Sequence, residues 1–321
     1  MKLEDKNNNV SLIKEAIVKT IAFFDLFDYP VTVFELWRFI NIKCELNSVL
    51  SILQSRSDPI ALRVIGSLNG FYFLQGRSDI IRKRMERYNY TDRKIKKAIL
   101  VARIFKFIPW IKMIAVSNII GAHNLKNKSD IDIFIITEKD RVWLSRFFST
   151  GLMKLLRQRP KQGDEQDKIC LNFYLSSEDL DLKKFMMDNM DVYYIYWLAN
   201  LVPIYNKVDT YQKLIKANNW LKHYLPNWKI TKTAYRRNSG KGLSDFYYEV
   251  VDLLLGGLEQ NLTNWQLRKL PRVLKDIMNQ DTRVVIDDQV LKLHAKDRRQ
   301  EYKIKLQQRL VDIELLNWTL Q

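Results

Sequence analysis

The sequence predicts an α/β (α+β) protein with a mixed sheet at its core, a small N-terminal module and a helical C-terminal region. Three observations support this fold class. Strand-like apolar runs begin near Ile111, Ile131 and Ile169. Short helical segments and a hairpin signal precede these runs, and long stretches with helical apolar spacing follow them. At 321 residues, the chain is long enough for about two domains.

The first 78 residues contain three helical segments and a hairpin signal, in that order. Residues 10–28 have apolar side chains at the helical period. Thr32 and Glu35 have the spacing of a capping box at the start of a second helix, and Leu46–Gln54 is a third apolar helix. Asn69-Gly70 lies between two β-rich runs, which is the strongest short-range hairpin signal. This order of elements predicts a winged-helix-like domain over residues 1–78.

The third helix of this module gives little support for DNA binding. A helix that enters a DNA groove normally presents Arg, Lys, Asn or Gln to phosphates and base edges. Leu46–Gln54 contains no Lys or Arg, and Asn47 and Gln54 are its only candidates. DNA binding and a structural or protein-docking role therefore both stay open for this module.

A basic helical segment is expected to link the module to the core over residues 79–110. Apolar residues such as Ile95 and Ile99 alternate with its cations, which predicts one buried stripe and one cationic face. That face is either a solvated surface or a surface for nucleic acid. Its cations are Arg82, Lys83, Arg84, Arg87, Arg93, Lys94, Lys96 and Lys97.

The stretch Met113–Thr137 contains the most specific chemical signal in the chain. An apolar run leads into a polar turn, and Ser129-Asp130-Ile131-Asp132 then opens a second run. Residues two apart in a strand share a face, so Asp130 and Asp132 are expected to lie close enough to hold one divalent cation. Hard cations such as Mg²⁺ prefer carboxylate oxygens, and metal ions stabilise the oxygens of a phosphoryl displacement.

A strand, a turn and then Ser-Asp-x-Asp resembles the signature of the polymerase-beta-like nucleotidyltransferase superfamily. The whole chain is similar to bacterial nucleotidyltransferase-domain proteins, and the core would then be residues 111–182. The resemblance implies that Asp130 and Asp132 ligate Mg²⁺ (or Mn²⁺) and bind a nucleoside triphosphate as substrate. The matching stretches are SDIDIFIIT (129–137), KICLNFYL (168–175), LIKANNWLKHYLPN (214–227) and LHAKDRRQEY (293–302).

The resemblance also implies a nucleotide-binding turn after the first strand. The superfamily has Gly-Ser there, whereas this chain has Asn118-Ile119 after Ser117. Gly121-Ala122 takes that place if the turn is shifted, and both registers stay open. Ser129 is expected to position one carboxylate through a hydrogen bond.

A third carboxylate often lies on a later strand in the superfamily, and the matching residue here is Asn172. Its amide oxygen is neutral, so weaker metal binding and slow or lost catalysis are expected. Within the strand Ile169–Leu175, we expect Phe173 to share a face with Leu171, and Asn172 to share the other with Cys170.

Residues 183–321 are predicted to form the helical C-terminal domain. Val192–Tyr205 is expected to be a buried helix, Val284–Ile286 a short strand or extended link, and Asp288–Leu316 a charged helix with an Arg298-Arg299 pair. A basic loop within Lys229–Gly242 fits the backbone of a nucleic acid, with an aromatic ring to stack on a base. A solvated loop fits it equally well. The candidate nucleic-acid-binding residues are Lys232, Tyr235, Arg236, Arg237 and Lys241.

Charge and cysteine content restrict the partner and the compartment. The formal net charge is +17, which favours a polyanionic partner, RNA before DNA, although a biased genome also produces Lys-rich chains. Cys44 and Cys170 are far apart and form no disulfide framework, so a cytoplasmic location is expected. No signal peptide is apparent, and the longest apolar segment, with 14 residues, is too short for a transmembrane span.

These observations favour a Mg²⁺-dependent nucleotidyltransferase that acts on nucleic acid, most plausibly RNA such as tRNA. The alternative is a catalytically impaired nucleic-acid-binding or scaffold protein on the same fold. The acceptor, the preferred nucleotide and the oligomeric state stay open.

Overall fold

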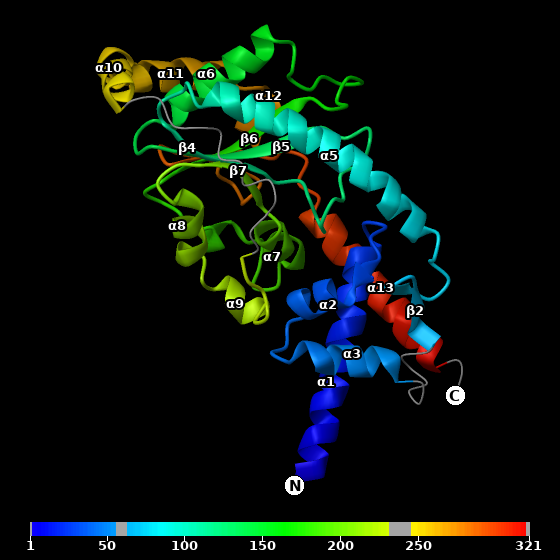
Figure 1. The fold of residues 1–321 in the computed structure, drawn as a ribbon. Helices are drawn as coiled ribbons and strands as arrows, with labels where there is room; N and C mark the ends of the chain where they lie inside the picture. Colours follow the sequence, from blue (N-terminus) through cyan, green and yellow to red (C-terminus); the bar gives the residue numbers. More distant parts are fainter. Residues whose placement is uncertain (1, 56–62, 231–244, 319–321) are drawn as a thin grey trace.

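The computed structural model describes residues 2–55, 63–230 and 245–318. A six-stranded sheet lies at the centre of the fold (Figure 1). The strand order is β7-β4-β5-β6-β9-β8. Only the central pair β5 and β6 is parallel, and the four other pairings are antiparallel, so the predicted mixed sheet is confirmed. The strands are β4 (Ile111–Val116), β5 (Ile131–Thr137), β6 (Ile169–Ser176), β7 (Val202–Asn206), β8 (Val284–Ile286) and β9 (Val290–Leu293).

Within its described residues, the N-terminal part contains the helices α1, α2 and α3 and a small three-stranded sheet of order β1-β3-β2. The capping box is confirmed, since the Glu35 amide donates to Thr32 Oγ1 at 3.3 Å and the Thr32 amide to Glu35 Oε2 at 2.8 Å. The hairpin is also confirmed, with Asn69 and Gly70 at positive φ between β2 and β3. These elements are α1 (Lys2–Asp25), β1 (Val31–Thr32), α2 (Val33–Phe39), α3 (Leu46–Gln54), β2 (Ile65–Leu68) and β3 (Phe71–Leu74).

The basic helix α5 (Ile80–Phe105) differs from its predicted cationic face. Met85 is exposed, whereas Arg84, Arg87 and Lys94 are buried and paired with acids. Arg84 binds Glu35 at 2.8 Å, and Lys94 binds Asp167 at 2.6 Å. Burying a cation is favourable only beside a partner, so the tertiary ion pairs override the apolar periodicity. Much of the positive charge of α5 therefore holds the fold together.

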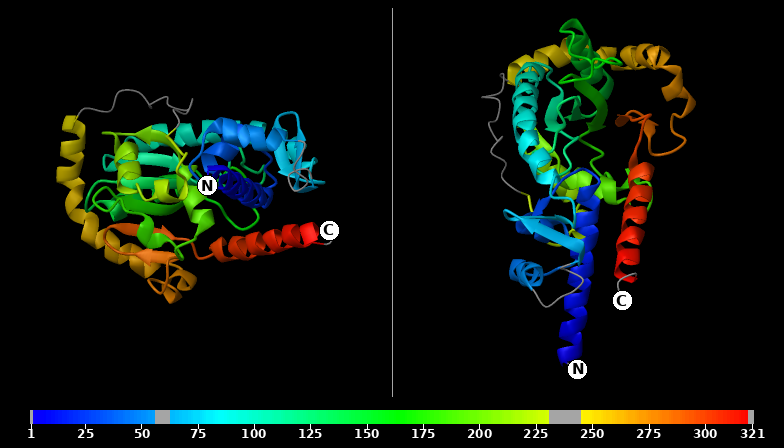
Figure 2. Two further views of the ribbon diagram at one scale, coloured as in Figure 1. Left: turned by 90° about the horizontal axis from the view of Figure 1, so that it is seen from below. Right: turned by 90° about the vertical axis from the view of Figure 1, so that its right-hand side faces the viewer.

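Helices cover both faces of the central sheet (Figures 1 and 2). One face packs against α5, α6 (Val142–Leu155) and α11 (Glu259–Lys269). The other face packs against the N-terminal helices and against α7, α8, α9 and α13. The remaining elements are α7 (Val192–Ala199), α8 (Thr210–Ala217), α9 (Leu221–Tyr224), α10 (Asp245–Leu255), α12 (Arg272–Asp276), α13 (Arg299–Trp318) and the 3₁₀ helices Lys183–Phe185 and Gly256–Leu258.

The C-terminal region is less purely helical than expected, because β7, β8 and β9 come from it and join the central sheet. The predicted helix Val192–Tyr205 divides into α7 and β7. Pro203 lacks an amide proton, which suits an edge strand such as β7 and disfavours a helix interior. Residues 288–298 form a turn, β9 and a connection instead of helix, and α13 begins at Arg299.

The first and last helices, α1 and α13, contact each other on one side of the central sheet (Figure 2). Among the described parts of the chain, every helix is either too short or too polar to cross a lipid bilayer.

Candidate metal centre

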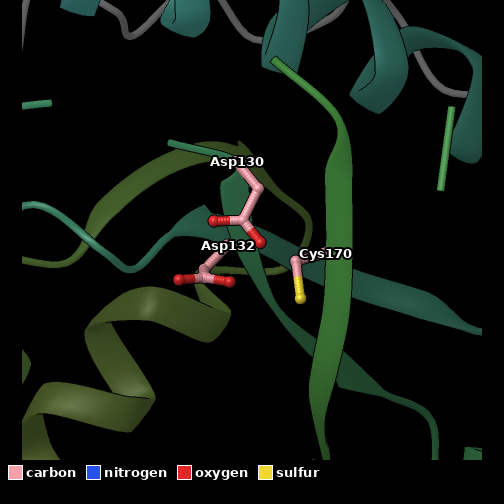
Figure 3. Close-up of side chains that lie close together, drawn as sticks. All are labelled: Asp130, Asp132 and Cys170. Atoms are coloured by element: carbon pink, nitrogen blue, oxygen red, sulfur yellow. The ribbon is translucent and has the colours of Figure 1, made fainter. Parts of the chain in front are cut away.

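Three potential metal ligands meet where β5 and β6 begin. Asp132 is the second residue of β5, and Asp130 immediately precedes that strand. One ligand atom each from Asp130, Asp132 and Cys170 lies within 4.8 Å of the other two (Figure 3). The structure thus brings the two sequence-predicted carboxylates together and adds a thiol from the neighbouring strand.

The parallel pairing of β5 with β6 places Cys170 at this position. In the parallel pairing, Asp132 lies opposite Cys170, and Phe134 lies opposite Phe173, so β6 has one extra residue between these points. The bulge moves Phe173 to the face opposite Leu171, which corrects the alternation expected from the sequence. Asn172, the expected counterpart of a third carboxylate, instead donates from Nδ2 to Cys170 Sγ at 2.8 Å.

Burial and mutual repulsion perturb both carboxyl groups. Burial and, after it, the neighbouring Asp130 charge raise the pKa of Asp132 to about 7. Burial also raises the pKa of Asp130, with a hydrogen bond to Cys170 opposing the shift. Among the described residues, neither carboxylate forms an ion pair with Lys, Arg or His. The two carboxylates repel each other and have no cationic partner among the described residues, so a cation bound between them would stabilise the site.

The two carboxylates line a cavity of about 410 Å³ between the sheet and the helices beneath it. An aromatic wall faces them. Tyr193 of α7 and Tyr302 of α13 are stacked with centroids 5.1 Å apart, and Phe27 lies 4.7 Å from Tyr302. The N-terminal module, the central sheet and the last helix therefore all contribute to one cavity.

Several cations also line the cavity, but only some are available to a ligand. Arg299 is buried and paired with Asp191 at 3.0 Å and Asp297 at 2.7 Å. Buried Lys292 donates to the Thr282 carbonyl. Lys126 and Lys296 are exposed, and neither ammonium group has an ion pair or hydrogen bond within the described residues. These two side chains are the ones positioned to meet an anionic ligand.

His294 adds a neutral polar group to the same cavity. Burial and, after it, the charge of nearby Lys292 lower the pKa of this imidazole to about 3, so the ring is uncharged at neutral pH. Its buried Nδ1 has no hydrogen-bond partner among the described residues. A buried polar atom without a partner is rare. His294 lines the cavity, which is large enough for a ligand.

The turn between β4 and β5 divides the predicted nucleotide-binding residues between two places. Ser117, Asn118 and Ser129 line the main cavity, and Asn118 Nδ2 donates to the Asp130 carbonyl at 3.0 Å. The Ser129 hydroxyl donates to the Lys126 carbonyl, not to a carboxylate as expected. Gly121 lines a different cavity, of about 250 Å³. The structure therefore separates Gly121 from the two Asp side chains.

Gly121 is needed for packing against the N-terminal module. Its φ is +84°, and a Cβ there would lie 2.7 Å from the ring of Tyr29. This contact explains a glycine at this position without any ligand. The candidate nucleic-acid residues Lys232, Tyr235, Arg236, Arg237 and Lys241 lie outside the described residues.

Sequence reasoning missed the contribution of β9 and the start of α13. The stretch Lys292–Tyr302 forms one wall of the cavity although it is about 160 residues from Asp130. Its signal was the dense alternation of His, Lys, Asp and Arg in HAKDRR, which the sequence analysis assigned to a charged helix over Asp288–Leu316 without a role in the site. The aromatic residues of α7 were expected only as a buried helix.

Comparisons of the chain with models of protein families, with curated proteins and with solved structures find no match.

Proposed function

We propose that this chain is a divalent-metal-dependent nucleotidyltransferase, which transfers a nucleoside monophosphate from a nucleoside triphosphate to a hydroxyl of nucleic acid, RNA such as tRNA being favoured. The observation that supports it most is the Asp130–Asp132 pair. The two carboxylates are close together, lack a cationic partner within the described chain and face a cavity of about 410 Å³. A metal–triphosphate complex matches that charge pattern.

The donor set fits Mg²⁺ or Mn²⁺, since two carboxylates offer the hard oxygen ligands that these ions take. When bound, the ion supplies neutralisation of the charge on the triphosphate oxygens during displacement. Asp130 and Asp132 would hold it at the start of β5, and Asn118 would keep the preceding turn in place through the Asp130 carbonyl.

The other residues of the cavity bind and orient the substrate in this proposal. Lys126 and Lys296 lie against the triphosphate, and the His294 imidazole accepts a hydrogen bond through Nδ1. The acceptor hydroxyl oxygen forms a bond to the α-phosphorus, and its proton passes to solvent. The bond from that phosphorus to the bridging oxygen breaks, and pyrophosphate leaves. The chain contributes positioning and charge, which are the main demands of phosphoryl transfer.

We further propose that the N-terminal elements form a winged-helix-like module, with the β2–β3 hairpin as its wing. The exposed residues of α3 include Asn47, Ser51 and Gln54, which are polar and uncharged. A module with this surface fits protein docking or support of the cavity through Phe27 better than binding to a DNA groove. Nucleic acid is then bound elsewhere, and the net charge of +17 supports such binding.

A second candidate function is a catalytically impaired nucleic-acid-binding or scaffold protein. Two observations favour it. The turn after β4 places Asn118, not glycine, beside the carboxylates, and Cys170 occupies the position where another carboxylate would complete the ligand set. In this alternative the fold and the cavity persist while turnover is lost.

An assay for transfer of radiolabel distinguishes the transferase from the binding protein. Each of the four α-labelled nucleoside triphosphates is offered with Mg²⁺ or Mn²⁺, with total RNA, single-stranded DNA or the protein alone as acceptor. We expect label in RNA with the wild type and none with Asp130→Asn/Asp132→Asn. Asp288→Asn is a matched control, since Asp288 is exposed in the turn between β8 and β9. Equal absence of label from wild type and double variant, with RNA binding retained by both, would establish the binding protein instead.

A further inference from the structure

The thiol of Cys170 belongs to the same ligand cluster as the two carboxylates. Its partner across the parallel pairing is Asp132, and paired residues in adjacent strands point to the same face. Figure 3 shows the three side chains converging from the beginnings of β5 and β6. Their ligand atoms lie within 4.8 Å of one another, so rotations of single side chains bring all three to one ion.

Asn172 gives independent support for sulfur as an electron-pair donor. Its amide Nδ2 donates to Cys170 Sγ at 2.8 Å, so the sulfur acts as an acceptor. Donors of this kind orient metal-bound thiolates and favour the charged form. Asn172 thus has a place in the site as a positioning residue.

Metal binding at this cluster requires the Cys170 thiol to lose its proton. The carboxylates of Asp130 and Asp132 lie beside the sulfur and surround it with negative charge. A metal ion that binds there displaces the proton from sulfur to solvent, as coordinating thiols require. The same negative surroundings that disfavour a free thiolate favour a cation beside it.

We propose that Asp130, Asp132 and Cys170 together bind one divalent cation softer than Mg²⁺, such as Zn²⁺ or Co²⁺, with the Cys170 thiolate as the third protein ligand. This inference rests on the proposed function in one respect, namely that the two carboxylates bind a metal. Thiolate ligands select Zn²⁺ and Co²⁺, whereas Mg²⁺ takes oxygen ligands in near-octahedral geometry. The carboxylates alone suit Mg²⁺ or Mn²⁺, and the sulfur shifts the preference of the site toward Zn²⁺ or Co²⁺.

Titration of Co²⁺ into the full-length protein, kept reduced with a phosphine, tests this. We expect a thiolate-to-cobalt charge-transfer band in the near ultraviolet for the wild type. Cys170→Ser loses the band and binds Co²⁺ about tenfold more weakly or worse by calorimetry, while its Mg²⁺ affinity changes little. Cys44→Ser, the matched control, keeps the band, since Cys44 lies in the N-terminal module. Cys170→Asp loses the band and binds Mg²⁺ about tenfold more tightly than the wild type.

The outcomes separate this inference from the proposed function. Co²⁺ binding that requires both Asp residues but gives no band, or is unchanged in Cys170→Ser, overturns the thiolate ligand and leaves the proposed function intact. Absence of Co²⁺ and Mg²⁺ binding in the wild type overturns both. Thermal melts of Cys170→Ser and Cys170→Asp show that each variant is folded before its titration is interpreted.

Discussion

At the scale of single residues, the most informative group is Asp132. Its carboxyl is desolvated and lies beside Asp130, and both effects raise its pKa, to about 7 from a usual value of 3.8. Between these two values the native protein binds more protons than the unfolded chain. The free energy of unfolding of the metal-free protein therefore falls as pH rises through that window.

Asp132→Asn should remove this pH-dependent decrease in the free energy of unfolding. In the presence of a chelator, we expect the variant and the wild type to be similar near pH 4. At pH 8 the variant should be the more stable by on the order of 2 kcal/mol, because it lacks the repulsion with Asp130. Urea unfolding across the pH range measures the difference. Parallel profiles for the two proteins would show that the carboxyl is not perturbed in this way.

Lys296 is the second residue for which the structure gives a specific expectation. It is exposed, lines the cavity and has no ion pair or hydrogen bond in the described parts of the chain. We expect Lys296→Gln to raise the KM for the nucleoside triphosphate about tenfold, the loss of one charge-assisted contact, with no change in Tm. Steady-state kinetics measures it. Lys222→Gln, at an exposed residue of α9, is the control, and equal effects of both variants would contradict the assignment.

At the scale of elements, local sequence signals predicted individual helices and hairpins well, but they predicted the register between paired strands less well. Thr32 and Glu35 fixed the start of α2, and Asn69-Gly70 fixed the hairpin, because both signals are satisfied by neighbouring residues. The bulge between Cys170 and Phe173 was not predictable, since it depends on pairing with β5. Asp130 and Asp132 could be found from sequence because they are two residues apart at the start of one strand. Cys170 could not, because its place beside them depends on the pairing of β6 with β5.

The turn between β4 and β5 allows a test at the same scale. In Gly121→Ala, the alanine would have to adopt a positive φ of +84°, and its Cβ would lie 2.7 Å from the Tyr29 ring. Gly163→Ala has a similar φ of +82° but nothing within 4 Å of a new Cβ. We expect both to lose about 1 kcal/mol through backbone strain, and Gly121→Ala to lose roughly a further 1–3 kcal/mol through overpacking. Urea denaturation compares them, and equal losses would contradict the close contact with Tyr29.

At the scale of the whole molecule, distant segments assemble the site. Phe27 follows α1, Tyr193 lies in α7 and Tyr302 in α13, and the three rings meet over the cavity. Sequence periodicity predicted each of these helices but not their meeting, which depends on three C-terminal strands joining the central sheet. The cationic face predicted for α5 is wrong in part for a related reason. Arg84 and Lys94 are buried because they pair with Glu35 and Asp167, which are distant in sequence.

Asp25 joins α1 to α13, and its loss should weaken the whole fold. The buried carboxylate pairs with Arg77 at 3.0 Å and with Arg309 of α13. Asp25→Ala leaves the Arg309 guanidinium without its acid, while Arg77 keeps Asp28 at 2.8 Å, so we expect a loss of roughly 1.5–3 kcal/mol. Chemical denaturation measures it, with Asp288→Asn as the exposed-carboxylate control. A loss below about 1 kcal/mol would show that this pair contributes no more than a surface ion pair.

The central claim is that Asp130 and Asp132 form a metal-dependent site for a nucleoside triphosphate. Calorimetric titration of a non-hydrolysable nucleoside triphosphate, with and without Mn²⁺, tests it most directly. We predict binding to the wild type and to Asp288→Asn only when Mn²⁺ is present, and no binding to Asp130→Asn/Asp132→Asn under either condition. Binding that is independent of Mn²⁺, or that persists in the double variant, would contradict the claim.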